Sequence, residues 1–261
     1  MLRSRVIPCL LVHDKGLVKT LKFSVEDGKY VGDPINAVKI FNEKYVDEIM
    51  VLDIDATVQG REPDYEMIKN VATECRMPLC YGGGVTTVEQ VRKIIKLGAE
   101  KVAISAAAMK NPDLLGQMSE VVGAQSVVLV LDIMKKKSFF GGAHYEIFTH
   151  NGKQKTCKKL YEFLEEIKSI PYGELVINNI DLDGIMTGYD LEMCDKVREL
   201  TEVPLTFLGG AGSYQDLKTL VDRFGIIGAA AGSIFVFKGK YKAVLIQYPM
   251  PHEKREIQPL K

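Results

Sequence analysis

The sequence has no excess of charge of either sign. Lys plus Arg and Asp plus Glu each number 34 among 261 residues, so the formal net charge at pH 7 is zero and no overall field favours nucleic acid as a partner. Long apolar runs are also absent, since none approaches the roughly 18 to 20 residues of a membrane span. The apolar stretch near the start is too short for a secretory signal. We therefore expect a cytoplasmic protein with no membrane span.

Regular spacing of metal or disulfide ligands is missing too. The five cysteines form an odd, scattered set without a CxxC pair, and Cys9 and Cys80 lie within apolar stretches, which predicts buried thiols. The four histidines show no ligand spacing, so the sequence indicates neither a metal nor a cofactor. His13 alone lies at an expected strand end, where it could contact a substrate.

A short pattern occurs twice in the chain. The segments MPLCYGGGV (77–85) and VPLTFLGGAG (203–212) are apolar runs that end in glycines, and Pro78 and Pro204 are 126 residues apart. The same offset pairs Gly83 with Gly209. A repeated buried strand followed by a glycine turn indicates a repeated βα architecture. We therefore expect two duplicated half-barrels, at about 1–122 and 123–250.

Short strand-like stretches alternate with amphipathic helical stretches along most of the chain. Residues 88–97 and 191–200 repeat apolar side chains three and four positions apart, as helices that lie on a sheet do. Alternation of this kind predicts a parallel sheet, and the length suits one (β/α)8 TIM barrel, an α/β fold, over residues 1–261. The expected strands are 6–12, 48–54, 79–81, 101–105, 126–132, 174–178, 205–208 and 226–230.

Two connections are long for a compact barrel. Residues 13–34, rich in glycine and charge, are interpreted as a mobile loop, and residues 145–157, around Asn151 and Gly152, as a hairpin inserted after the fifth strand. The run 135–137 is three lysines, which is typical of a solvated loop. Both long connections would lie at the carboxyl ends of the strands, the active face of such barrels.

The glycine turns predict two anion sites on that face, because glycine lets backbone N–H groups approach a ligand closely. Two sites at positions related by the repeat indicate a substrate with a phosphate at each end. The candidate phosphate-binding residues are Gly84, Ser105, Gly184, Gly210, Gly232 and Ser233.

Candidate acid and base groups follow from the same geometry. Asp132 ends the apolar stretch SVVLVLD and Asp183 follows INNID, so both carboxylates are expected at the barrel mouth. Lys19, on the long first connection, could supply a cation over an anionic substrate. The alternative for Lys19 is an exposed loop lysine.

The chain resembles the cyclase subunit of imidazole glycerol phosphate synthase over essentially its whole length. The segments that carry the resemblance are RVIPCL, KYVGDP, DEIMVLDI, GGGV, EKVAISAAA, AQSVVLVLD, GELVINNIDLDG, TGYD and LGGAG. The resemblance implies a duplicated (β/α)8 barrel that forms a heterodimer with a glutaminase subunit. It also implies that ammonia from the partner passes through the barrel to a substrate with two phosphates.

The resemblance also assigns roles to particular residues. It implies that Asp132 is the catalytic aspartate of the fifth strand, that Lys19 is the catalytic lysine of the first loop, and that Asp183 acts beside a phosphate. A ring of four charges at the strand starts would form the ammonia gate on the opposite face. These gate residues are Arg5, Glu48, Lys101 and Glu174.

Three departures from the family pattern concern the reacting centre. Leu11 stands where the family has its first-strand catalytic aspartate, and leucine cannot transfer a proton. Asn178 replaces a threonine near the reacting centre and is a possible substrate contact. Ser105 and Ala106 replace an Asn-Thr pair at one phosphate site. Loss of one acid or base costs roughly 10²- to 10⁴-fold in rate, so the family's ring closure is expected to be impaired.

Several functions therefore stay open. The segment CLLVHDKGLVKT, with Leu11, His13 and Asp14, resembles paralogues associated with acetamidino decoration of surface sugars, which work beside a separate sugar amidotransferase. We expect ammonia supply for sugar amidination, with a small phosphorylated or nucleotide-linked substrate. One alternative is an authentic synthase of histidine biosynthesis in which Asp14 or His13 replaces the missing aspartate. Another is a non-catalytic ammonia conduit that completes the glutaminase. Leu11 counts against an isomerase of the same pathway.

Overall fold

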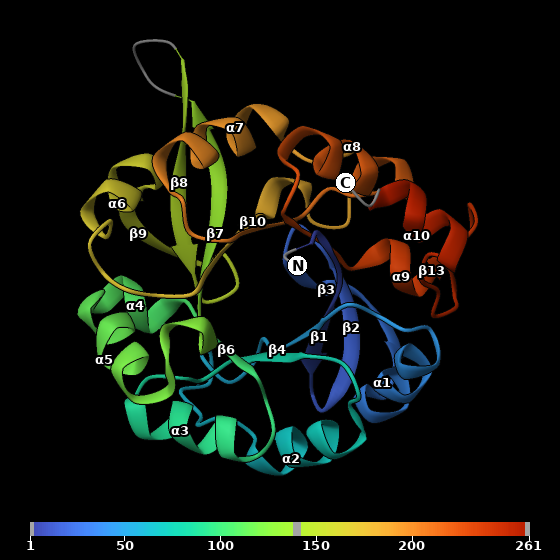
Figure 1. The fold of residues 1–261 in the computed structure, drawn as a ribbon, viewed down its shortest axis with the longest axis horizontal. Coiled ribbons are helices and arrows are strands. Elements are labelled where there is room, and N and C mark those ends of the chain that lie inside the picture. The colour runs from blue at the N-terminus through green and yellow to red at the C-terminus, as the bar shows by residue number, and fades with distance from the viewer. Residues whose placement is uncertain (1–2, 138–141, 259–261) are drawn as a thin grey trace.

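Eight parallel strands form a closed barrel in the computed structural model, which describes residues 3–137 and 142–258. The barrel closes because the last strand pairs with the first and the fifth pairs with the sixth. Figure 1 shows these strands inside a ring of helices. The prediction of a (β/α)8 TIM barrel is confirmed. The strands are β1 (Arg5–His13), β4 (Ile49–Asp53), β5 (Leu79–Gly82), β6 (Lys101–Ile104), β7 (Val127–Lys137), β10 (Glu174–Asn179), β11 (Leu205–Leu208) and β12 (Gly228–Ala231).

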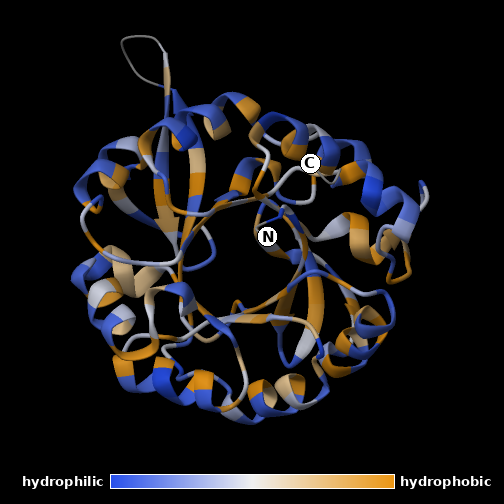
Figure 2. Cartoon of the chain, in the orientation of Figure 1, coloured by the Kyte–Doolittle hydropathy of each residue, from blue (hydrophilic) through white to orange (hydrophobic). Residues whose placement is uncertain are grey.

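The helices cover the outside of the barrel with one apolar face each. In α3 the buried apolar residues are Val91 and Ile94, three positions apart. Figure 2 shows hydrophilic residues on the outer faces of the helices. None of the helices in the described part of the chain is both long and apolar enough to cross a membrane. The helices are α1 (Pro34–Glu43), α2 (Tyr65–Glu74), α3 (Val88–Lys96), α4 (Ala106–Lys110), α5 (Asp113–Val122), α6 (Leu160–Glu166), α7 (Leu191–Leu200), α8 (Tyr214–Phe224), α9 (Ser233–Val236) and α10 (Pro251–Ile257), with 3-10 turns η1 (Ala124–Ser126) and η2 (Ile180–Leu182).

The 126-residue spacing extends to the helix caps. Helix α3 begins with a capping box between Thr87 and Gln90, and α8 begins with one between Ser213 and Asp216. In each box the hydroxyl accepts from a backbone N–H of the first turn and the longer side chain accepts in return. Strands β5 and β11 and helices α2 and α7 also begin 126 residues apart. These equalities support the half-barrel prediction, which stays a prediction.

Two apolar cores lie on the two sides of the barrel wall. The larger one fills the space between strands and helices and includes Phe41 and Phe163. The smaller one lies inside the barrel, where alternate residues of each strand point. The prediction of buried thiols is confirmed for Cys9, Cys80 and Cys194, whereas it is wrong for Cys75, which is half-buried, and for Cys157, which is exposed. The inner core consists of Ile7, Cys9, Met50, Cys80, Ala103, Val128, Val130, Val176, Leu208 and Ala230.

The prediction of a mobile loop over residues 13–34 is wrong. The segment forms an antiparallel hairpin of β2 (Gly16–Leu21) and β3 (Ser24–Gly32), and β2 pairs with β1. Asp14 and Lys15 adopt left-handed backbone angles, with φ of 46° and 64°, as a tight hairpin turn requires. The glycine and charge content of the segment gave no sign that residues 17–20 of β2 are buried.

The hairpin predicted after the fifth strand is present. Strands β8 (Ala143–Thr149) and β9 (Gln154–Lys159) form it, and β8 also pairs with β7. The three lysines 135–137 do not form a loop: they continue β7 outward along β8, so that prediction is wrong. Figure 1 shows β7 and β8 projecting beyond the ring of helices. A short pair, β13 (Phe237–Lys238) and β14 (Ala243–Val244), follows α9.

Strand β12 packs closely against its neighbours because Gly228 has no side chain. We predict that Gly228→Ala destabilises the fold. A Cβ there would overlap Thr206 Oγ1 and lie 3.1 Å from Ile7. We expect the free energy of unfolding, measured with urea, to fall by about 1–3 kcal/mol, the usual range for overpacking. Gly116→Ala is the matched control, because a Cβ there meets other atoms at 3.7 Å or more. Alanine should stabilise α5 by up to about 1 kcal/mol. Equal effects of the two substitutions would contradict this account.

Candidate functional site

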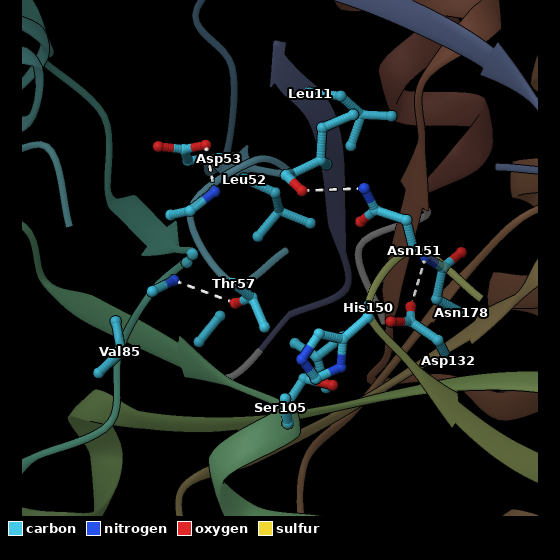
Figure 3. A pocket seen from close by; sticks show the side chains of 18 of the residues that line it. Leu11, Leu52, Asp53, Thr57, Val85, Ser105, Asp132, His150, Asn151 and Asn178 are labelled. Carbon is cyan, nitrogen blue, oxygen red and sulfur yellow. Dashed lines mark hydrogen bonds between the residues drawn. The ribbon is translucent and has the colours of Figure 1, made fainter. Parts of the chain in front are cut away.

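A cavity of about 540 Å³ opens at the carboxyl ends of the strands. Its floor includes the apolar strand ends Leu11, Leu52 and Leu208, and its rim includes His150 and Asn151 from the turn between β8 and β9. Asn151 Nδ2 donates to Ile54 O at 2.9 Å, which ties this turn to the segment after β4. Figure 3 shows Leu11, Leu52, His150 and Asn151 around the cavity. In barrels of this architecture the same face carries the active site.

Asp132 and Asn178 form a hydrogen-bonded pair at the cavity wall. They are register partners on β7 and β10, and Asn178 Nδ2 donates to Asp132 Oδ1 at 3.0 Å, as Figure 3 shows. Burial raises the pKa of Asp132 to about 7, although the hydrogen bond from Asn178 opposes this and the charge of Asp183 adds to it. A carboxyl group with such a pKa can both give and accept a proton near neutral pH.

The other carboxylates that line the cavity have local partners. Asp53 accepts from the backbone N–H groups of Asp55 and Ala56 and lies 3.4 Å from Arg61. Asp183 accepts from Thr20 Oγ1 at 2.6 Å. Among the cavity-lining carboxylates of the described residues, Asp132 therefore has the protonation behaviour that best suits acid and base work.

Lys19 lies at the wall of the cavity on β2. Its side chain is buried, and Nζ donates to Cys9 O at 2.5 Å. Burial lowers the pKa of Lys19 below its ordinary value, while the nearby groups of Cys9 and Asp183 oppose this shift. A Cβ at position 232 would collide with Nζ, so Gly232 makes room for the lysine. The alternative of an exposed loop lysine is therefore wrong.

The first predicted anion site, Gly82–Gly84 with Ser105, opens into the cavity. Gly83 and Gly84 have φ of 122° and 71°. A Cβ on Gly83 would collide with the backbone oxygen of Asp53, and a Cβ on Gly84 with that of Arg61. Sequence reasoning missed the cations on this side. Arg61 and Lys110 line the same cavity, and burial and the charge of Lys110 lower the pKa of His150. Because Arg61, Lys110 and His150 lie in segments outside the barrel strands, no strand-end pattern could have identified them.

The second predicted anion site borders a separate hollow of about 20 Å³, and Gly184, Gly210, Gly232 and Ser233 line it. That volume is close to the space one water needs. The β2–β3 hairpin lies against this site, because Lys22 N donates to Asp183 O at 3.0 Å and Phe23 N donates to Asp183 Oδ2.

The four predicted gate residues meet at the opposite end of the barrel, and we call them the charge ring. Lys101 Nζ lies 2.8 Å from Glu48 Oε2 and 2.7 Å from Glu174 Oε2, and Arg5 pairs with both carboxylates. Burial alone would raise the pKa of Glu174, but Arg5 and Lys101 reverse the shift and lower it. Thr206 Oγ1 also donates to Glu174. The ring closes the strand-start end of the barrel.

The residues proposed as substitutes for the missing aspartate lie beside the cavity. His13 Nδ1 lies 2.7 Å from Asp55 Oδ1, and Asp14 N donates to Asp55 Oδ2. Neither His13 nor Asp14 is among the described residues that line the cavity. The three side chains are close enough together to share a metal ion, a grouping that sequence spacing did not indicate because Asp55 lies 41 residues from Asp14.

Leu11 lies on the side of the cavity opposite Asp132. It pairs in register with Leu52, and both pack against the inner core. Figure 3 shows Leu11 and Leu52 across the cavity from Asp132. The first-strand position therefore contributes an apolar surface and no proton transfer.

We predict that the carboxyl carbon of Asp132, followed by NMR, titrates with a midpoint near 7. Asn178→Ala should move the midpoint upward, because the hydrogen bond to the carboxylate is lost. A raised pKa means that the folded protein binds this proton more tightly than the unfolded chain. The free energy of unfolding therefore falls as the pH rises from about 4 to above 7.

Asp132→Asn removes that loss, so the variant should gain stability relative to the wild type as the pH rises, by up to about 1.4 kcal/mol for each unit of pKa shift. The difference should be clearly larger at pH 9 than at pH 5. Urea unfolding at the two pH values measures the difference. A midpoint near 4, or a gap that does not depend on pH, would contradict the raised pKa.

Comparisons with known proteins agree with this geometry. Residues 5–242 match the family described as histidine biosynthesis protein. A relative from Vibrio vulnificus (strain YJ016), provisionally named imidazole glycerol phosphate synthase subunit hisF3, is 56% identical over 98% of this chain and 96% of its own length. A Pseudomonas aeruginosa relative, provisionally named subunit hisF2, is 47% identical over 95% of this chain and 97% of its own. The imidazole glycerol phosphate synthase subunit HisF of Streptococcus sanguinis (strain SK36) is 37% identical over 90% and 91%. The chain therefore belongs to the histidine biosynthesis protein family, among its HisF-like subunits.

Proposed function

We propose that this protein is a cyclase-type synthase subunit of a glutamine amidotransferase, which receives ammonia from a glutaminase subunit and delivers it to the cavity. One arrangement carries the proposal: a ring of buried charges at one end of an apolar barrel interior, and an acid of suitable pKa at the other. Relatives named as synthase subunits support the pairing with a second chain.

The charge ring supports the entry of ammonia. Two buried carboxylates and two partly buried cations at the bottom of a barrel are costly to desolvate, and apolar residues of similar size would fill that layer at no such cost. Above the ring the interior is filled with apolar side chains and two thiols. A path that opens between such side chains would admit neutral ammonia and disfavour the ammonium ion, which is not a nucleophile.

The acceptor in this proposal is a sugar of surface polysaccharide synthesis rather than the histidine-pathway intermediate. Leu11 supports this choice, because one of the two acids of the family's ring closure is missing while Asp132 is kept. The open first anion site, with Arg61 and Lys110 beside it, suits a small phosphorylated or nucleotide-linked substrate. A separate sugar amidotransferase would complete the transfer.

Authentic imidazole glycerol phosphate synthase is the alternative enzyme. It would need another group to replace the first-strand aspartate. His13 and Asp14 bind Asp55 instead of lining the cavity, which disfavours this alternative.

A second candidate is a conduit that completes the glutaminase and does no chemistry itself. The observation that favours it is the small hollow at the second anion site, about 20 Å³, which is far smaller than the cavity at the first. In a conduit Asp132 would have no catalytic role, whereas the charge ring would still matter.

To test the acceptor, we would assay the purified barrel with ammonium and the bisphosphorylated substrate of imidazole glycerol phosphate synthase. We expect cyclised product at least about 10²-fold more slowly than with the Streptococcus sanguinis relative, because one proton-transfer group is absent. Leu11→Asp should raise the rate by restoring a carboxylate. Equal rates for the two wild-type proteins would contradict the proposed acceptor.

To separate enzyme from conduit, we would follow nitrogen-15 from amide-labelled glutamine into surface polysaccharide in a strain that lacks its own copy. As an enzyme, the protein should lose most incorporation with Asp132→Asn and with Lys101→Ala. Lys196→Ala, which removes an exposed pair with Glu192, is the control. Full incorporation with Asp132→Asn together with loss in Lys101→Ala would favour the conduit.

A further inference from the structure

The inward side chains of β10 connect the charge ring to the cavity. Glu174, Val176 and Asn178 alternate along the strand and therefore face the barrel interior, at its bottom, middle and top. Their register partners on β7 are Val128, Val130 and Asp132. A small molecule that passes the ring meets apolar side chains first and the amide of Asn178 last.

Asn178 carries an unsatisfied acceptor. Its Oδ1 is buried and has no hydrogen-bond partner within residues 3–137 and 142–258, and the residue is 5% exposed. Buried polar groups in folded proteins nearly always have a partner, so an enclosed oxygen without one indicates a donor that belongs there. When Asp132 is ionised, as at pH 9, its carboxylate can only accept, so Nδ2 is the donor it receives and Oδ1 is left without a partner.

The enclosure of Oδ1 limits what the donor can be. Oδ1 is buried although Asn178 lines the cavity, so any donor reaches it only after side chains move. Water or ammonia needs a smaller movement than a sugar or phosphate group. Ammonia has three N–H groups, so it can donate one to Oδ1 and keep its lone pair free for attack on a carbon.

We propose that Asn178 Oδ1, beside Asp132, is the binding site at which ammonia stops after it leaves the barrel interior. This inference rests on the proposed delivery of ammonia through the barrel and names its end point. Asn178 acts as a positioning residue there, and the adjacent carboxylate of Asp132 lies where it can accept a proton once nitrogen has formed its new bond.

Methyl NMR of the full chain at pH 9 tests the proposal, with Val176 and Val130 as reporters next to the site. Ammonium chloride, which supplies neutral ammonia at this pH, should shift both methyl signals saturably. Potassium chloride at equal ionic strength should not, since potassium matches ammonium in charge and size but has no N–H. Equal shifts with the two salts, or no saturable shift with ammonium chloride, would overturn the proposal.

Variants test whether Asn178 Oδ1 is the hydrogen-bond acceptor for ammonia. Asn178→Ala should weaken the apparent affinity for ammonia about tenfold, and Asn178→Thr, which keeps an oxygen acceptor, should restore part of it. Asn111→Ala is the matched control, because it removes an amide from another part of the cavity lining. Unchanged affinity in Asn178→Ala, with a folded spectrum, would overturn the assignment. Because the titration needs neither glutaminase nor acceptor, its failure is distinguishable from failure of the proposed function.

Discussion

The neutralisation of four charges inside a closed barrel is the constraint on which the rest of the structure depends. Glu48 and Glu174 are almost completely buried, and each is paired with both Arg5 and Lys101. Removal of either cation would leave a carboxylate that is desolvated and underpaired, which proteins tolerate poorly. Closure of β12 against β1 also depends on Thr206, which donates to Glu174 and fills the space beside Gly228. The bottom of this barrel is therefore a polar layer that ion pairs and a hydrogen bond from Thr206 hold together.

The residues at the cavity end of the barrel differ from one side to the other, whereas the charges at the opposite end are balanced. On one side burial raises the pKa of Asp132 to about 7 and Asn178 donates to its carboxylate, and on the other Leu11 pairs in register with Leu52. The two glycine-rich sites differ as well, since the first opens into the large cavity and the second borders a hollow of about 20 Å³. We propose that a duplicated scaffold with related halves at about 1–122 and 123–250 has kept its ammonia path while the chemistry at its mouth has changed.

The fold could be predicted from the sequence because strand and helix patterns alternate and because two glycine turns recur 126 residues apart. Strand ends also located Asp132, since the carboxyl ends of parallel strands meet at one face. The expectations for Asn178 and for the charge ring came from the family resemblance, because by sequence alone each of the four charges is an ordinary strand-start residue. The β2–β3 hairpin could not be predicted, because its stability comes from pairing with β1 rather than from its own composition. Lys110 and His150 were missed because only tertiary packing brings them to the cavity.

The central claim is that ammonia reaches the cavity from a glutaminase through the barrel rather than from solvent. The most direct measurement is an isotope competition in permeabilised cells that contain the complex, with amide-nitrogen-15 glutamine and an excess of unlabelled ammonium at pH 8.5. The account predicts that the amidated product carries mostly glutamine nitrogen, because the ammonia never mixes with the medium. A product whose label follows the proportions of the two nitrogen pools would contradict it.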